Sequence, residues 1–361
     1  MILAATIRIL IACILISFGL RANFAAIDNA SENCFRRPAD SAVNWPGKRL
    51  PTLIERWQAE LILLGEVVET KFEDGGQFSR IRVISAIKSK ETNVAGEVKV
   101  FIQMGSHWPY TFQANTKVLA FLKFDDNRGC YVDFNDRDGG FEVDQATGEF
   151  YVERYSKLGN ILKIEQPTEL LNAKRDWYVK LGLNPSTRTE AAYGIRILWG
   201  DAKRKELLRE RAARSPGNWL TDEQKASILA VIAKEEPDWN AYEMIKLLKD
   251  VPSVEIDQYL MKAIRQSLTD DQLVPCKNLT IAHLAFELLP DRLGIPLTRS
   301  LETASKAYYD QMIDYSYHIS IGDEYSEAEK VKAKNALIKE WRKLASALMA
   351  LVPLEQSERG R

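Results

Sequence analysis

Two hydrophobic patterns divide this chain of 361 residues, and their order constrains the fold more than any other feature. Between Leu61 and Val152, short segments alternate apolar and polar side chains, a period of two that is typical of half-buried β-strands. From about Thr168 onward, the apolar positions recur at helical spacing instead. Strands followed by helices predict an α+β protein with more than one domain.

The first part of the chain is expected to form a small antiparallel barrel. Several short strands at close spacing, with no helix between most of them, favour a barrel over a parallel sheet. Gly65 suits a bulge or a bend, and residues 125–129 form a turn. The expected strands cover residues 61–68, 78–87, 97–103, 118–124 and 130–134, followed by a hairpin of 141–143 with 150–152.

The first residues have the features of an export signal. Arg8 precedes the apolar residues 9–20, and small residues follow at positions 22, 25 and 26. The apolar stretch is shorter than the roughly 20 residues that span a bilayer. We therefore expect residues 1–25 to be a cleaved signal peptide, which leaves a periplasmic or secreted protein with no stable membrane span. An uncleaved anchor is the alternative, and the cleavage site stays open.

Export changes the interpretation of the cysteines. Removal of Cys13 with the signal leaves Cys34, Cys130 and Cys276, an odd number in an oxidising compartment. We expect a disulfide between Cys34 and Cys130, which would close a loop of roughly 95 residues and contribute about 4 to 5 kcal/mol before strain. Cys276 is expected to be a buried thiol of the helical part, because a lone cysteine is usually a small core residue.

After the signal, the predicted organisation has three parts. Residues 26–160 form the β-barrel domain with an extended leader, residues 165–354 form an all-α domain, and residues 355–361 form a disordered tail. The helical prediction rests on pairs with capping-box spacing, in which a hydroxyl and a side chain three residues later bind two orphan amides. These pairs are Thr187 with Glu190, Thr221 with Gln224, Thr269 with Gln272, and Ser326 with Glu329.

The last helix carries an apolar stripe at heptad-like spacing. The stripe spans barely two heptads, so packing in the domain core is favoured over a coiled coil with a partner. Its residues are Leu337, Trp341, Leu344, Leu348 and Leu351.

The succession of elements in the β module carries a family resemblance. A short helix precedes a Leu-rich strand that ends in Gly65-Glu66-Val67, and Gly96-Glu97-Val98-Lys99-Val100 follows an alternating strand. Residues 115–122 and a late cysteine complete the pattern. Over residues 34–152, this succession resembles bacterial relatives of the tissue inhibitors of metalloproteinases (TIMPs), whose netrin-like domain is an OB-fold. The resemblance implies an OB-like barrel.

The chain departs from that family at the functional end. The animal inhibitors of the family act through an N-terminal cysteine, in a Cys-x-Cys start, whose amine and carbonyl chelate the zinc of the protease. Here Phe35 and Arg36 follow Cys34, which lies well downstream of every expected cleavage point. Inhibition by that chelate is therefore not carried over to this chain, and no metal ligand is assigned.

The best candidate contact surface is an aromatic loop between two expected strands. His107, Trp108 and Tyr110 lie in this loop, and aromatic side chains on an exposed loop supply large contact area at low entropic cost. The alternative is that Trp108 and Tyr110 close the end of the barrel. His283 is expected to be a satisfied core or edge histidine rather than a ligand, and His318 has no acidic or cysteine neighbour at metal-binding spacing.

Composition and motifs narrow the function classes. The 49 basic and 50 acidic residues nearly balance, so nothing favours a nucleic-acid partner. The sequence has no Gly-x-Ser-x-Gly, phosphate-loop, Cys-x-x-Cys or His-Glu-x-x-His motif, so no catalytic residue and no cofactor is assigned. The leading hypothesis is an exported, non-enzymatic binding protein, in which an OB-like barrel and a helical scaffold recognise an unknown protein or envelope component. The alternatives are an envelope hydrolase with a site near His107, and a protease inhibitor that acts through the Trp108 loop.

Overall fold

The chain divides into two units. In this computed structural model, the described residues are 52–73, 75–90, 94, 96–103, 111–134, 140–269, 280–321 and 326–352. The sheet unit contains the described residues up to Ile232 together with Glu243–Leu248. The C-terminal helical unit contains Ala233–Tyr242 and the described residues from Lys249 onward. The predicted domains 26–160 and 165–354 stay a prediction.

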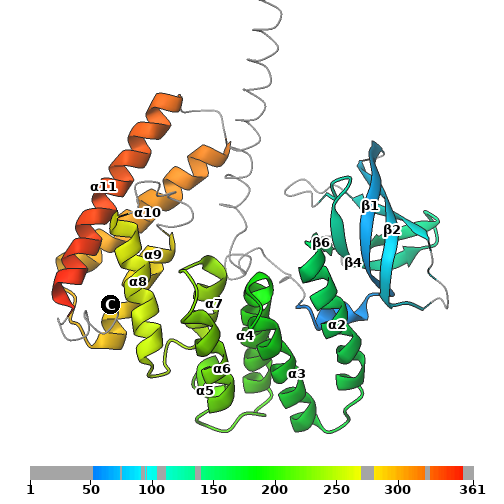
Figure 1. The fold of residues 1–361 in the computed structure, drawn as a ribbon, viewed down its shortest axis with the longest axis horizontal. Coiled ribbons are helices and arrows are strands. Elements are labelled where there is room, and N and C mark those ends of the chain that lie inside the picture. The colour runs from blue at the N-terminus through cyan, green and yellow to red at the C-terminus, as the bar shows by residue number, and fades with distance from the viewer. Residues whose placement is uncertain are drawn as a thin grey trace, which may run out of the picture. The chain divides into compact units, whose positions relative to one another are not determined.

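The elements are those of an α+β protein, as the sequence predicted (Figure 1). The sheet unit begins with η2 (Glu55–Gln58), β1 (Leu61–Glu73), β2 (Gly76–Lys88), β3 (Glu97–Gln103), β4 (Lys117–Asp125), β5 (Cys130–Asp133) and β6 (Gly140–Glu142). It continues with α2 (Gln145–Ile161), α3 (Pro167–Gly182), η3 (Pro185–Thr187), α4 (Arg188–Arg204), α5 (Pro216–Trp219) and α6 (Asp222–Ile232). α7 (Trp239–Leu247) contributes residues to both units, and α8 (Val254–Thr269), α9 (Thr280–Leu293), α10 (Arg299–Ile321) and α11 (Glu327–Leu351) belong to the C-terminal helical unit.

The six described strands form one mixed sheet. Its strand order is β1-β2-β3-β5-β4-β6, and β1 also pairs with β4. All pairings are antiparallel except that of β3 with β5, where Val100 lies opposite Tyr131 and Phe101 opposite Val132. The expectation of a purely antiparallel sheet is therefore wrong. The chain between β3 and β5 passes through β4, which gives it the long connection that a parallel pair requires.

Two local predictions about the sheet are confirmed. β1 and β2 shift register between Leu64 and Gly65, so a bulge lies at the predicted glycine. A Cβ at Gly65 would collide with the Ile81 side chain and the Arg82 carbonyl, so no larger residue fits without rearrangement. The turn before β5 closes as expected, because the Gly129 amide donates to the Asp125 carbonyl and Gly129 has a φ of 61°, which favours glycine.

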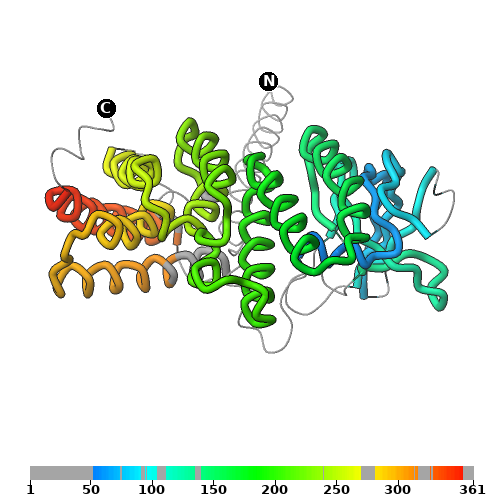
Figure 2. The backbone as a smooth tube through the Cα atoms, turned by 90° about the horizontal axis from the view of Figure 1, so that it is seen from below, coloured from blue at the N-terminus to red at the C-terminus, as the bar shows by residue number. Residues whose placement is uncertain are grey.

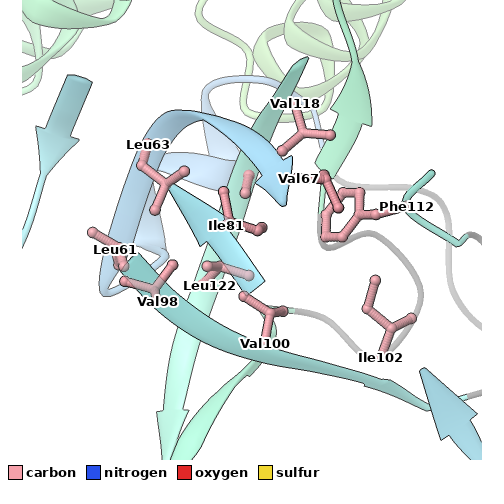
Figure 3. Close-up of a cluster of buried hydrophobic side chains, with 11 residues drawn as sticks. Leu61, Leu63, Val67, Ile81, Val98, Val100, Ile102, Phe112, Val118 and Leu122 are labelled. Carbon is pink, nitrogen blue, oxygen red and sulfur yellow. The ribbon is translucent and has the colours of Figure 1, made fainter. Parts of the chain in front are cut away.

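One face of the sheet encloses a hydrophobic cluster (Figure 3). The period of two places Ile81 in this cluster while Arg80 and Arg82 on the same strand are exposed, as expected from the alternation. The cluster consists of Leu61, Leu63, Val67, Ile81, Val98, Val100, Ile102, Phe112, Val118, Ala120 and Leu122.

The predicted hairpin of residues 141–143 with 150–152 is wrong, because residues 150–152 lie in α2. Asp144 caps this helix: its carboxylate accepts hydrogen bonds from the Thr147 amide at 2.7 Å and from the Thr147 hydroxyl at 2.9 Å. Tyr151, Tyr155 and Leu158 then form one buried helical face. Asp and Gly favour both turns and helix ends, so this segment resembled a hairpin turn in the sequence.

α2 packs against the start of the sheet through aromatic side chains. The Tyr155 ring lies 5.7 Å from that of Phe121 in β4 and 5.6 Å from that of Trp177 in α3, measured between ring centroids. Its hydroxyl donates to the Leu53 carbonyl at 2.9 Å. The Arg56 guanidinium lies over the Phe121 ring at 5.2 Å. These contacts make α2 part of the sheet unit rather than a separate helical layer.

The remaining helices of the sheet unit continue this packing. α3 and α4 lie side by side (Figure 2). Arg196 in α4 forms an ion pair of 2.8 Å with Glu243, whose side chain is completely buried. A buried carboxylate is costly without a cationic partner, so this pair fixes Glu243 against α4.

The predicted helix caps have mixed outcomes. Thr221 and Gln224 form both bonds of a capping box, and so do Ser326 and Glu329. The box predicted at Thr187 is wrong, because its hydroxyl donates to the Leu181 carbonyl at 2.5 Å. The pair Thr269 and Gln272 extends outside the described residues.

The C-terminal helical unit has its core around His283, a predicted core histidine that is 0% exposed. Its Nε2 atom lies 3.1 Å from the Ser305 hydroxyl and 3.2 Å from the Ser305 carbonyl. The Trp341 indole donates to the Ser267 hydroxyl at 2.8 Å. Four residues of the predicted α11 stripe are buried and Leu351 is 43% exposed, so core packing accounts for most of the stripe. His318 lies in α10, and its side chain is outside the described part.

Burial lowers the pKa of His283, and the hydrogen bond between its imidazole and the Ser305 carbonyl, which acts as acceptor, offsets this effect only in part. The rings around the imidazole are those of Phe286, Tyr308, Tyr309 and Trp341, which carry no negative charge. A group with a lower pKa in the folded state binds more protons when unfolded, so stability is full above about pH 6.5 and falls below it. We expect the melting temperature of the C-terminal helical unit to fall between pH 7 and pH 5, and His283→Gln to reduce that fall. Equal pH dependence of the two proteins in thermal unfolding would contradict this assignment.

Candidate functional site at the base of the aromatic loop

The structure describes the two ends of the predicted contact loop. His107, Trp108 and Tyr110 belong to residues 104–110, which lie outside the described residues, as do Cys34 and Cys276. Cys130 is described: it opens β5, is 2% exposed and lies opposite Asp125. Burial raises the pKa of its thiol. Cys130 is not disulfide-bonded to any described residue, and Cys34, its predicted partner, lies outside them.

β3 leads into the loop from a fully paired position. Its last two residues, Ile102 and Gln103, lie opposite Gln77 and Gly76 at the start of β2. A Cβ at Gly76 would collide with the Phe101 ring and the Ile102 carbonyl, so the strands approach closely here because residue 76 is glycine. The chain therefore enters the loop from a fixed point on the sheet.

A buried side-chain amide holds the other end of the loop. The Phe112 amide donates to Gln77 Oε1 at 2.8 Å, and Gln77 Nε2 donates to the Phe112 carbonyl at 2.8 Å. Gln77 and Phe112 are each 1% exposed. The Phe112 ring lies in the hydrophobic cluster close to Val67 (Figure 3). The Gln77 amide thus satisfies both backbone groups of Phe112, as a neighbouring strand would.

The residues that follow Phe112 are bound to the sheet by further hydrogen bonds. The Asn115 amide donates to the Val67 carbonyl at 2.8 Å, and the Val67 amide donates to the Thr116 carbonyl at 2.9 Å. Asn115 has a φ of 66°, a conformation that asparagine adopts more readily than most residues. The Glu142 carboxylate accepts from the Gln113 amide at 3.2 Å and from the Thr116 hydroxyl at 3.1 Å.

These contacts bring the described residues on either side of residues 104–110 to one point of the sheet. Ile102 lies opposite Gln77 in the strand register, and the Phe112 amide donates to the Gln77 side chain. Phe72, which lies opposite Gln77 in β1, is 62% exposed and adds apolar area beside this point.

Charges near the loop base are paired rather than concentrated. Glu69 lies 3.2 Å from the Lys71 ammonium and 3.0 Å from the Arg80 guanidinium, and Arg80 also lies 3.4 Å from Glu97. The hydrogen bond from Lys71 lowers the pKa of Glu69. These charges neutralise one another in exposed pairs, each of which contributes little to stability.

The sequence analysis named residues 107, 108 and 110 as a contact surface, which stays a prediction, and it missed Gln77. The available signal was a polar residue at an inward position, because Gln77 shares the inward parity of Ser79 and Ile81. A polar side chain at such a position needs a hydrogen-bond partner. Its partner, Phe112, lies 35 residues away, and no local pattern identifies it.

The C-terminal helical unit contains a hollow between α10 and α11. It has a volume of about 570 Å³. Its lining includes four alanines and several charged or amide groups. The alanines are Ala304, Ala307, Ala333 and Ala336, and the polar groups are Gln311, Asp314, Lys330 and Glu340.

Comparisons of the chain with protein families, curated proteins and solved structures found no match. Within the described parts of the chain, no three His, Cys, Asp or Glu side chains are grouped closely enough to hold a metal ion. None of the helices in those parts has both the length and the apolar character needed to cross a membrane.

The Gln77 clamp is testable through stability. Replacement of Gln77 by Met keeps a similar length but removes both hydrogen bonds that Gln77 makes to the buried Phe112 backbone. We expect the free energy of unfolding of the sheet unit to fall by about 2 to 6 kcal/mol, because loss of a hydrogen bond to a buried group costs about 1 to 3 kcal/mol. Gln103→Met, at an exposed position at the end of β3, is the matched control and should change stability by less than about 0.5 kcal/mol. Equal urea midpoints for the two variants would contradict the clamp.

Proposed function

We propose that the protein is an exported, non-enzymatic binding protein whose main contact surface is the aromatic loop of residues 104–110. The observation that carries this proposal is the double hydrogen bond between Gln77 and Phe112, which fixes one end of the loop to the buried face of the sheet. A buried side-chain amide that binds one end of a loop restricts the movement of that end. A restricted loop end favours recognition, because less conformational freedom is lost on binding. His107, Trp108 and Tyr110 would supply the contacts.

We further propose that the sheet is an OB-like barrel of the netrin-like kind. The order of strand pairings supports this: β1 pairs with β2, β2 with β3, β3 with β5, β5 with β4, and β4 with β1 again. A series of five strands that returns to its first member has the strand count of an OB-fold barrel. The TIMP-like identity of residues 34–152 remains a proposal that rests on the sequence pattern.

Export and the disulfide belong to the same proposal. The signal-like residues 1–25 support a periplasmic or secreted location, and the buried position of Cys130 at the start of β5 suits a structural bridge. The helical region would act as a scaffold or second contact surface, and the hollow between α10 and α11 supports the latter role.

The hydrolase and protease-inhibitor alternatives stay predictions. Both depend on the same loop, the first through His107 and the second through Trp108. Loss of a measured hydrolytic activity in His107→Ala would favour the hydrolase. Inhibition of a metalloprotease that depends on Trp108 would favour the inhibitor.

Peptide mapping tests the predicted bridge. In the exported protein, digested without reduction, we expect a peptide pair that joins Cys34 to Cys130, with Cys276 alkylated. The expectation follows from the oxidising compartment and from the entropy that a long closed loop removes from the unfolded chain. Alkylation of both Cys34 and Cys130 in the unreduced, unfolded protein would contradict the bridge.

Partner capture tests the binding proposal. The exported protein is immobilised and exposed to an envelope or secreted fraction, and the captured partner is then purified and titrated by calorimetry. We expect the double variant Trp108→Ala with Tyr110→Ala to weaken the measured affinity at least about tenfold, as truncation of aromatic anchors does. Val331→Ala, a change at a 56% exposed position in α11, should leave the affinity unchanged. Equal affinity of the double variant and the wild type would contradict the assignment of the loop.

A further inference from the structure

A polar hollow of about 290 Å³ lies at the end of the sheet where β1 begins and β4 ends. It is lined by Glu60, Lys90, Phe124, Asp126 and Tyr131. The loop base at Gln77 lies toward the other end of β1, because the register pairs Phe72 with Gln77. The hollow is therefore a separate site, independent of the loop described above.

Two aromatic rings line the hollow. Phe124 and Tyr131 lie opposite each other on β4 and β5, with ring centroids 5.3 Å apart and an interplanar angle of 79°. Phe124 has the same strand parity as the core residue Leu122, so it extends the enclosed face of the sheet beyond the core. It is nevertheless 42% exposed, which leaves ring surface accessible in the hollow. An exposed ring at the end of an enclosed face provides a platform for a flat or cationic group.

The Glu60 carboxylate also lines the hollow and has two hydrogen-bond partners. Glu60 forms an ion pair with Lys90, and its Oε2 atom accepts a hydrogen bond from the Phe124 amide at 3.1 Å. The bond from Lys90, followed by that from Phe124, lowers the pKa of Glu60, so this group is charged at neutral pH. The nearby Lys88 ammonium is bound by the carbonyls of Trp57 and Ala59 at 2.6 and 2.7 Å and does not line the hollow.

Asp126 differs from Glu60 because no described residue neutralises it. It lies exposed in the turn between β4 and β5, without an ion pair or side-chain hydrogen bond within the described parts of the chain. The adjacent Asp125 instead accepts from the Asn127 amide at 2.9 Å, a bond that shapes the turn. With Glu60 and Asp126 negative and Lys90 positive, the lining carries one net negative charge.

From this combination we propose that the hollow binds a guanidinium group, that of an arginine side chain on a partner protein. A guanidinium is planar and weakly hydrated, so it stacks on an aromatic face while its N–H groups donate to a carboxylate. Phe124 and Tyr131 supply the faces, and Asp126 supplies the carboxylate that lacks a partner. An anionic ligand would meet the net negative charge, and a neutral ligand would leave Asp126 uncompensated.

A titration with matched small probes tests this site. The ¹⁵N-labelled protein is titrated with N-acetyl-arginine amide and, separately, with N-acetyl-citrulline amide, which has nearly the same shape without the charge. We expect saturable NMR shifts at the amides of Phe124, Asp126 and Tyr131 with the arginine probe, and at least fivefold weaker binding of the citrulline probe. Equal binding of the two probes, or no shifts with the arginine probe, would overturn the proposal.

Two variants assign the roles of the lining residues. Asp126→Asn should weaken the arginine probe about threefold to tenfold, because an exposed charge pair is modest even where aromatic stacking supports it. Phe124→Leu keeps an apolar side chain but removes the ring, and should weaken the probe by a similar factor. Glu73→Gln, an exposed carboxylate at the opposite end of β1, is the control and should leave binding unchanged. Unchanged binding in Asp126→Asn, with the fold intact by circular dichroism, would overturn the proposal. A titration with N-acetylglucosamine gives a second check: saturable shifts at the same amides, without binding of the arginine probe, would also overturn it.

Discussion

The enclosed face of the sheet depends on how its ends are closed. At one end, Phe112 contributes a buried ring to the hydrophobic cluster, yet its backbone amide and carbonyl lie outside the strands. The Gln77 amide satisfies both groups at once. Phe112 therefore has two roles. Its ring belongs to the apolar core, and its backbone, bound by Gln77, fixes the chain where the loop ends.

Much of the sheet could be predicted from the sequence, because period-two patterns and single glycines act locally. The strands, the bulge at Gly65 and the turn before Cys130 follow from neighbouring residues alone. The parallel pairing of β3 with β5 does not follow from neighbouring residues, because the two strands are separated in the sequence by β4. The same limit explains α2, where Asp144 favours a turn and a helix cap equally until Tyr151 and Tyr155 find partners on the sheet and α3.

The candidate sites divide in the same way. Aromatic composition alone indicated the loop of His107, Trp108 and Tyr110, but its anchor joins residues 35 positions apart. The hollow at Asp126 combines side chains from β4 and β5 with side chains from segments just outside β1, β2 and β4, so no motif could reveal it. The sequence shows that Asp126 lies near Phe124, but only the structure shows that no described residue forms an ion pair with Asp126.

The central claim is that the Gln77 amide holds Phe112 as firmly as a strand would. Amide hydrogen exchange measured by NMR on the wild-type protein tests this at a single group, because the Phe112 amide has Gln77 Oε1 as its acceptor. We predict that the Phe112 amide exchanges as slowly as amides of the central strand β4, within about tenfold, since both then require opening of the sheet. Exchange of the Phe112 amide at the rate of an unprotected peptide would contradict the account.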